Sequence, residues 1–161
     1  MSPLHYPRYP RSPRRRRGAA IVEFALILTL LVSLVAAMFS FGRAFWYYDA
    51  LSKATRNAAR GLSVSNPATI ASVAVAAAKT AVSTDVTSAG LSSFTNANVL
   101  VACLDASMAT VTCTNGSAPA GVRVAITGYT LLLGAHMPFL VGASQTFNVN
   151  LAPATTMAYM R

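Results

Sequence analysis

An uncharged stretch of nineteen residues, Phe24 to Gly42, constrains this chain more than any other feature of its sequence. As a helix it would cover roughly 28 Å, close to the hydrocarbon thickness of about 30 Å of a lipid bilayer. No other part of the chain has eighteen successive apolar residues, and later apolar runs such as Tyr129 to Leu133 have the length of strands. The sequence therefore predicts a single membrane-spanning helix.

The charges on either side of this stretch predict its orientation. Six arginines and no acid precede Glu23 (Arg8, Arg11 and Arg14 to Arg17), whereas Asp49 partly offsets the cations that follow the stretch. Because positive flanks stay on the cytoplasmic side, we expect a single-pass protein of the cytoplasmic (inner) membrane, with residues from Arg43 onward outside the cytoplasm. A secretory signal peptide fits less well, since its apolar core is normally about 7 to 15 residues long.

Glu23, the only glutamate of the chain, stands where this helix begins. A carboxylate costs about 2.5 to 3.5 kcal/mol at the centre of a membrane helix and less near the interface, so an intramembrane acid indicates a functional site. We expect its partner to be a nearby amine. The alternative is that Glu23 lies in the headgroup layer near the Arg14 to Arg17 cluster.

Gly18, four small or apolar residues, Glu23 and Phe24 together resemble the type IV prepilin cleavage motif. The continuation is similar to the TadE-like pseudopilins of tight-adherence (Flp) pilus systems, densely over residues 19–63 and loosely afterwards. Three segments carry this second resemblance: Phe41-Gly42-Arg43-Ala44-Phe45, Asn57-Ala58-Ala59-Arg60-Gly61 and the chain end Thr156-Met157-Ala158-Tyr159-Met160-Arg161. One departure is Thr29, where these proteins commonly carry a proline that would kink the helix.

The resemblance implies that a prepilin peptidase cuts between Gly18 and Ala19, removes the basic leader 1–18 and leaves Glu23 fifth in the mature chain. The absence of a side chain on Gly18 would let the protease approach an extended backbone closely. Each lost arginine is worth on the order of 1 kcal/mol against an anionic leaflet, so the trimmed helix becomes easier to extract. The new amine of Ala19 can then be neutralised by Glu23 of a neighbouring subunit.

The implied function is that of a minor pilin or pseudopilin that assembles through its N-terminal helix. Its partners would be the prepilin peptidase, other pilins or pseudopilins, the pilus assembly platform and membrane lipid. The formal charge of +9 falls to +3 without the six leader arginines, so we do not expect a nucleic-acid partner. The prolines of the leader forbid a helix there, and we interpret it as a disordered cytoplasmic segment.

Beyond the span, apolar residues recur three or four apart and predict that the helix continues outside the membrane as far as about residue 63. These are Tyr47, Leu51, Ala54, Ala58 and Leu62. Trp46, Tyr47 and Tyr48 fall where the helix leaves the hydrocarbon, which is typical of a membrane-interface aromatic belt. Lys53, Arg56 and Arg60 form a basic stripe that we interpret as a solvated face, with Asp49 and Lys53 as an i,i+4 ion pair.

The rest of the chain, 64–161, predicts an extracytoplasmic domain of the α+β class. Asn66 and Pro67 favour the start of a short helix that ends near Ser83, with Ile70, Val73, Ala77 and Ala81 on its buried face. From Asn98 the apolar period changes to two and predicts an antiparallel sheet of about four strands. The inward positions are Val99, Val101 and Cys103; Val111 and Cys113; Val122, Val124 and Ile126; and Phe147, Val149 and Leu151.

Cys103 and Cys113 are equidistant from Met108, so a hairpin centred there would place them directly opposite each other. We therefore expect a disulfide, with two buried free thiols as the alternative. A zinc site is not expected, because the two thiols and His136 are too few ligands for an ordinary structural site after the leader is removed. We interpret His136 as a loop residue.

No cofactor, small-molecule substrate or catalytic site is expected, because the exported part lacks nucleophile, metalloprotease and phosphate-binding motifs. Two other classes stay open. An unprocessed, membrane-tethered binding domain would share the same span and sheet. A membrane-anchored enzyme would require a deep pocket in which Asp105 and His136 converge.

Overall fold

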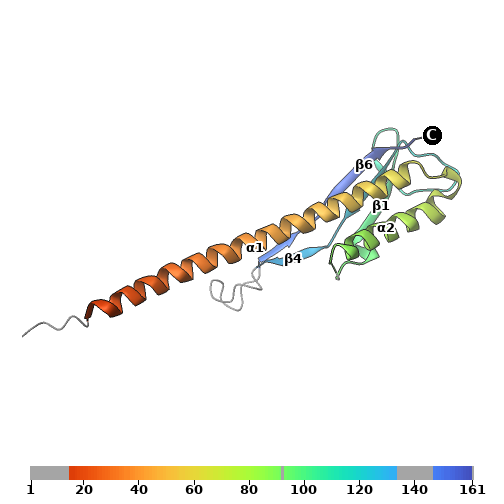
Figure 1. Cartoon of the computed structure of the whole chain (residues 1–161). Coiled ribbons are helices and arrows are strands. Elements are labelled where there is room, and N and C mark those ends of the chain that lie inside the picture. The colour runs from red at the N-terminus through yellow and green to blue at the C-terminus, as the bar shows by residue number, and fades with distance from the viewer. Residues whose placement is uncertain (1–14, 92, 134–146, 161) are drawn as a thin grey trace, which may run out of the picture. The chain divides into compact units, whose positions relative to one another are not determined.

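The computed structural model describes residues 15–91, 93–133 and 147–160 of the chain. Two compact units, residues 1–38 and 39–161, both contain part of helix α1, which runs from Arg15 to Ser63. Most of the predicted leader and the predicted loop from Gly134 to Gly142, with His136, lie outside the described residues. Figure 1 shows α1, α2 and the sheet strands in colour.

Helix α1 continues without a break to Ser63, as the recurrence of apolar residues three or four apart predicts. Its last carbonyl groups, which have no partner within an α-helix, are bonded by nearby serines. The Ser63 hydroxyl donates to the carbonyl of Arg60 at 2.8 Å, and the Ser65 hydroxyl donates to that of Leu62 at 2.8 Å. The predicted end of the helix before Asn66 is therefore confirmed.

The C-terminal part of α1 contributes one face to the core of the second unit. All five residues of the predicted seam are buried: Tyr47, Leu51, Ala54, Ala58 and Leu62. They pack in one cluster with α2 and with the inner face of the sheet. The period of 3.6 thus correctly identified which side of this helix the rest of the domain covers.

The second helical segment begins where the sequence predicts but ends later. The Asn66 side chain accepts a hydrogen bond from the Ala68 N–H at 2.9 Å and caps a 3-10 turn, η1 (Pro67–Thr69). A π-helical turn, η2 (Ile70–Ala74), then leads into α2 (Val75–Ser88). The predicted end near Ser83 was wrong, because the Ser83 and Thr87 hydroxyls bond to carbonyls of preceding turns at 3.0 and 2.6 Å, so these polar residues fit within the helix.

The buried face of this segment also differs from the prediction. Ile70, Ala78, Val82 and Val86 are buried, whereas Val73 is 58% exposed. The helix ends in a Schellman motif, in which Gly90 at φ +92° donates to Thr87 and Leu91 donates to Val86.

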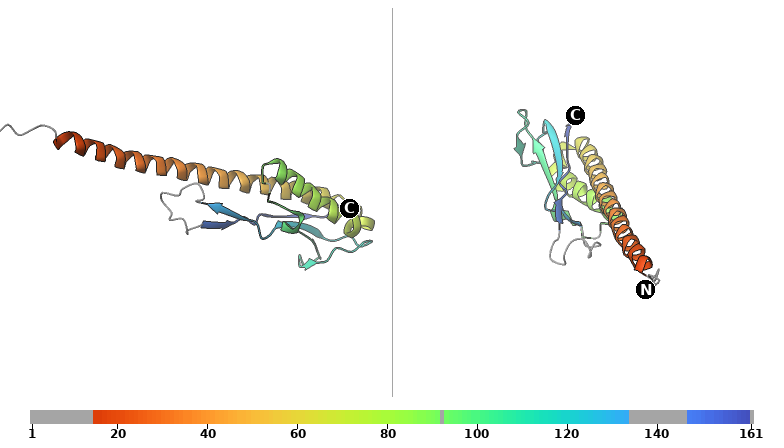
Figure 2. Two further views of the ribbon diagram at one scale, coloured as in Figure 1. Left: turned by 90° about the horizontal axis from the view of Figure 1, so that it is seen from below. Right: turned by 90° about the vertical axis from the view of Figure 1, so that its left-hand side faces the viewer.

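Four antiparallel strands form the main sheet in the order β2-β1-β3-β6. They are β1 (Val99–Leu104), β2 (Thr110–Val111), β3 (Gly121–Ile126) and β6 (Ala154–Ala158). Figures 1 and 2 show α2 and the C-terminal part of α1 on one face of this sheet. Alternate residues of β1 and β3 face the helices, and Val122, Val124 and Ile126 are all almost fully buried. The predicted α+β class with a four-stranded antiparallel sheet is confirmed.

The fourth strand of the sheet is not the predicted one. The segment beginning at Phe147 forms β5 (Phe147–Asn150), which pairs with β4 (Thr130–Leu133) in a separate two-stranded ladder. The place in the main sheet is taken by β6, a strand of small and polar residues that the apolar alternation did not reveal. In the structure every second residue is partly buried: Thr155 and Met157 within the strand and Tyr159 just after it.

Candidate assembly and processing segment

The predicted processing site lies inside a helix. Gly18 and Ala19 follow Arg15, the first residue of α1, by less than two turns. A Cβ atom added to Gly18 would meet no other atom within 4 Å, so packing does not require glycine here. Because proteases bind extended backbone, cleavage after Gly18 would need the first turns of α1 to unwind. Glycine makes this easier, since it costs a helix about 0.8 to 1 kcal/mol relative to alanine.

Glu23 and Phe24 are both exposed on the next turn of the helix. Ala19 and Glu23 are four residues apart, so they lie on the same face of α1. The alternative ion pair between Glu23 and the leader arginines involves side chains outside the described ones. The pairing of Glu23 with an amine, within a subunit or between subunits, stays a prediction.

The surface of α1 before residue 39 is almost entirely apolar and open. Large side chains on every side of the helix are 41 to 69% exposed: Ile21, Val22, Phe24, Leu26, Ile27, Leu28, Leu30, Leu31, Val32, Leu34, Val35 and Met38. The segment from Gly18 is long and apolar enough to cross a membrane, and it is the one such helix among the described residues. This is consistent with a single-pass membrane protein.

The two hydroxyl groups within this apolar segment are satisfied inside the helix. The Thr29 hydroxyl donates to the Ala25 carbonyl at 2.7 Å, and the Ser33 hydroxyl donates to the Thr29 carbonyl at 2.7 Å. Such bonds remove the cost of placing a hydroxyl in an apolar medium. Helix α1 is therefore continuous through Thr29, without the kink that a proline would impose there.

The three consecutive aromatic residues do not share one environment. Trp46 is 65% and Tyr48 is 49% exposed, whereas Tyr47 is 8% exposed and belongs to the core. The Arg43 Nε atom donates to the Tyr47 hydroxyl at 2.8 Å, and its guanidinium carbon lies 5.2 Å from the centre of the Tyr47 ring. A membrane-interface role stays a prediction for Trp46, Tyr47 and Tyr48, and the Tyr47 ring also packs in the core of its own domain.

The basic stripe of α1 lies on the exposed side of the helix. Lys53 forms the expected i,i+4 ion pair with Asp49, at 2.7 Å between Nζ and Oδ2. Arg56 and Arg60 are also exposed, and neither has an ion-pair partner among the described residues.

Cys103 and Cys113 form the expected disulfide, with their Cα atoms 5.1 Å apart. The predicted register was wrong, because Cys103 lies directly opposite Val111. The hairpin is centred on Ser107 and not on Met108, and Met108 lies in its turn in the left-handed region at φ +63°. Strand β2 ends at Val111, so the residues after it are not paired with β1. Cys113, two residues beyond Val111, therefore lies diagonally across from Cys103.

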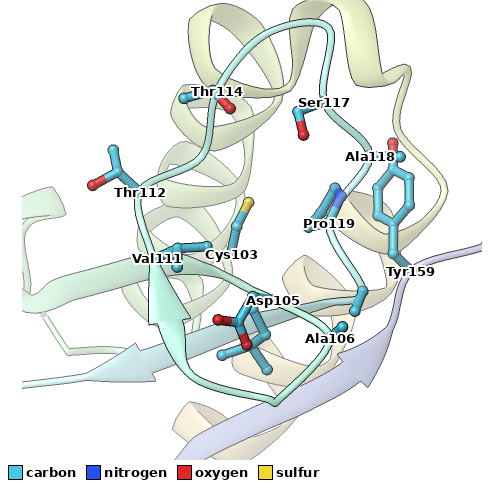
Figure 3. A pocket seen from close by; sticks show the side chains of 12 residues that line it. Cys103, Asp105, Ala106, Val111, Thr112, Thr114, Ser117, Ala118, Pro119 and Tyr159 are labelled. Carbon is cyan, nitrogen blue, oxygen red and sulfur yellow. The ribbon is translucent and has the colours of Figure 1, made fainter.

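A pocket of about 620 Å³ is lined by Cys103 of this disulfide, Asp105 and Tyr159, among other residues. Figure 3 shows these three side chains. The Asp105 carboxylate accepts hydrogen bonds from the Ser107 hydroxyl, the Ala109 N–H and the Ser107 N–H. These bonds, that from the Ser107 hydroxyl above all, lower the pKa of Asp105. Asp105 thus stabilises the turn, and His136, its proposed catalytic companion, lies outside the described residues.

The described residues contain no group of three histidine, cysteine or acidic side chains placed to hold a metal ion. We therefore find the chemistry of the described chain concentrated in three features: the apolar helix with Glu23, the basic stripe and the disulfide-bonded hairpin.

Three comparisons with known proteins bear on this segment. No curated protein and no solved structure matches the chain. Residues 18–60, from Gly18 through the basic stripe of α1, match the family model described as TadE-like protein. The match covers the processing segment, the apolar helix and most of the seam that packs on the domain. The resemblance of this chain to the TadE-like family is therefore confirmed over residues 18–60.

Proposed function

We propose that this protein takes part in the assembly of a tight-adherence (Flp) pilus as a minor pilin or pseudopilin. The observation that carries the proposal is the coincidence of two features in one segment. Residues 18–60 match the TadE-like family, and within them residues 18–38 present an apolar helical surface on every side, whose sole acid is Glu23. A helix that is apolar on every side requires lipid or other helices around it.

In this proposal the helix first anchors the protein in the inner membrane, with the leader in the cytoplasm. A prepilin peptidase removes residues 1–18, and the released amine of Ala19 pairs with Glu23 of a neighbouring pilin. Pairing selects the assembled register, because an unpaired carboxylate would otherwise stay in an apolar bundle. Trp46 and Tyr48 lie at the membrane interface before assembly. The protein acts through these contacts and not as an enzyme.

Mapping of the mature N-terminus by mass spectrometry tests the proposal. In cells with a prepilin peptidase we expect the chain to begin at Ala19, and in cells without it we expect the full leader. The alternative, an unprocessed membrane-tethered binding domain, predicts an intact leader in both strains.

Gly18→Ala should leave most of the protein uncut, and Gly42→Ala provides a matched control. Both glycines lie within α1, and in both cases an added Cβ meets nothing within 4 Å. The two substitutions therefore stabilise the helix alike, and only the first touches the cleavage site. Equal processing of both variants would count against cleavage after Gly18.

A further inference from the structure

Strand β6 forms one edge of the main sheet, and its outer side has backbone groups without ladder partners in the part of the chain that the structure describes. Two hydrogen bonds define which residues face β3: the Ile126 N–H donates to Pro153 at 2.9 Å, and the Tyr159 N–H donates to Ala120 at 3.1 Å. In an antiparallel pair the residues between these two points alternate. Thr155 and Met157 therefore bond to β3, while Ala154, Thr156 and Ala158 direct their N–H and C=O groups outward.

The opposite edge of the sheet is much shorter. Strand β2 has two residues, and the bond from the Asp105 N–H to the Ala109 carbonyl leaves Thr110 as its single outward-facing residue. Natural proteins protect edge strands with short length, charges, prolines or bulges. Within its five residues β6 has neither charge nor proline, so the sheet is protected at β2 and open at β6.

A groove of about 380 Å³ runs beside the open edge. Residues 153–156 line one side, and Tyr48, Ser52, Thr55 and Arg56 of α1 line the other. The hydroxyl groups of Thr55 and Thr155 are 3.1 Å apart and hold the helix against the strand. The Arg56 Nε atom donates to the Ser52 carbonyl at 3.2 Å, which keeps the guanidinium beside the groove without an acidic partner among the described residues.

We propose that the open edge of β6 binds an extended, acidic segment of a partner protein by strand addition. The outward groups of Ala154, Thr156 and Ala158 would supply the main-chain hydrogen bonds, as in other complexes that extend a sheet. Alternate side chains of the added strand would lie on the face of the sheet that α1 covers. A carboxylate at such a position meets the Arg56 guanidinium, which forms strong, two-pronged bonds with carboxylates.

A second copy of this chain does not supply that carboxylate from a strand. Its four acids are Glu23, Asp49 and Asp85 on helices and Asp105 in the hairpin turn, and none lies within β1 to β6. The charge of the groove therefore favours a different protein as the occupant.

Binding of defined peptides to the full-length protein in zwitterionic nanodiscs tests the proposal. The probe is a labelled peptide of alternating valine and glutamate, somewhat longer than β6, measured by fluorescence anisotropy. We compare it with the same peptide containing lysine in place of glutamate, and with a glutamate peptide methylated on alternate amide nitrogens. We expect the lysine peptide and the methylated peptide to bind at least tenfold more weakly.

Two variants examine the site itself. Thr156→Pro removes an outward N–H and leaves the bonds of Thr155 and Met157 to β3, so it should weaken binding at least tenfold. Thr156→Ala keeps the N–H and is the matched control, with binding close to that of the unchanged protein. Arg56→Gln should weaken binding of the glutamate peptide and not that of the lysine peptide.

Amide hydrogen exchange of the unchanged protein gives an independent measure that does not rely on a variant's folding. Bound peptide should slow exchange at Ala154, Thr156 and Ala158, and leave Thr155 and Met157 as they were. The proposal is overturned by equal binding of the methylated peptide, by equal binding of the lysine peptide, or by no binding. Self-association that Thr156→Pro abolishes would assign the edge to a second copy instead.

Discussion

The two parts of helix α1 on either side of residue 39 are both apolar and helical, yet they differ in what covers them. Beyond residue 39 the buried apolar residues, from Tyr47 onward, form a seam, and Leu51 in that seam is fully buried by the chain's own domain. Before residue 39 they surround the helix, and Leu30 is 69% exposed. The width of the apolar surface thus separates a helix that completes a fold from one that needs lipid or other subunits.

Because of this difference, burial of the two parts of α1 stabilises different states of the protein. Burial of the seam stabilises the folded chain, because the surface it removes from water is intramolecular. Burial of the N-terminal surface stabilises a membrane-bound or assembled state and contributes little to the fold of residues 39–161. Substitutions in the two parts should therefore separate assembly from folding.

Glu23→Ala should have the largest effect on assembly and little effect on folding or processing. Removing one partner of a buried ion pair costs about 3 to 5 kcal/mol, which corresponds to a hundredfold or greater loss of incorporation. The measurement is the ratio of protein in sheared fibres to protein in membranes, with the mature N-terminus mapped in parallel. Normal incorporation of the variant would show that Glu23 only occupies the headgroup layer.

Leu51→Ala and Leu30→Ala test the comparison most directly. Leu51 is fully buried, and its truncation should lower the free energy of unfolding by about 2 to 5 kcal/mol, with a cavity left behind. Leu30→Ala should change the unfolding of the domain by a few tenths of a kcal/mol at most, because its side chain is exposed. Denaturant unfolding in detergent, followed by near-ultraviolet circular dichroism, measures both. Similar losses would mean that the two parts of α1 are not energetically distinct.

The sequence predicted the features that depend on strong periodicity. Tyr47, Leu51 and Leu62 recur at helical spacing, and alternation marks Val122, Val124 and Ile126, so the helix seam and the central strand followed directly. The Asn66 cap was equally predictable, since asparagine followed by proline satisfies the first turn in a recognisable way.

The errors arose where tertiary context overrides weak local signals. The strand Ala154–Ala158 is small and polar, and it becomes a strand because β3 is available beside it. Met108 in a left-handed conformation shifted the hairpin register, and methionine gives no sign of such a conformation. The proposed assembly site could not be completed for another reason. A single chain supplies Gly18 and Glu23 but not the peptidase or the neighbouring pilins that would contact them.

Replacement of both cysteines by serine should affect the second unit alone. The closed loop is short, with a sequence separation of 10 between Cys103 and Cys113, and its loss should cost roughly 2 to 3 kcal/mol through the entropy of the unfolded chain. Unfolding of the double variant should match that of the reduced unchanged protein. Cleavage after Gly18 should be unaffected, and a processing defect would indicate that the domain influences the N-terminal segment.

Asp49→Ala should have the smallest effect, although Asp49 forms the one ion pair among the described residues. The Lys53 side chain is 68% exposed and the Asp49 side chain is 56% exposed, so water screens the attraction between them. Exposed i,i+4 pairs contribute about 0.3 to 0.5 kcal/mol, and less at high salt. A double-mutant cycle with Lys53→Ala at low and high salt measures the coupling. A coupling above about 1 kcal/mol would mean that the solvated face of α1 also holds the domain together, and the seam would no longer account for the difference between the two parts of the helix.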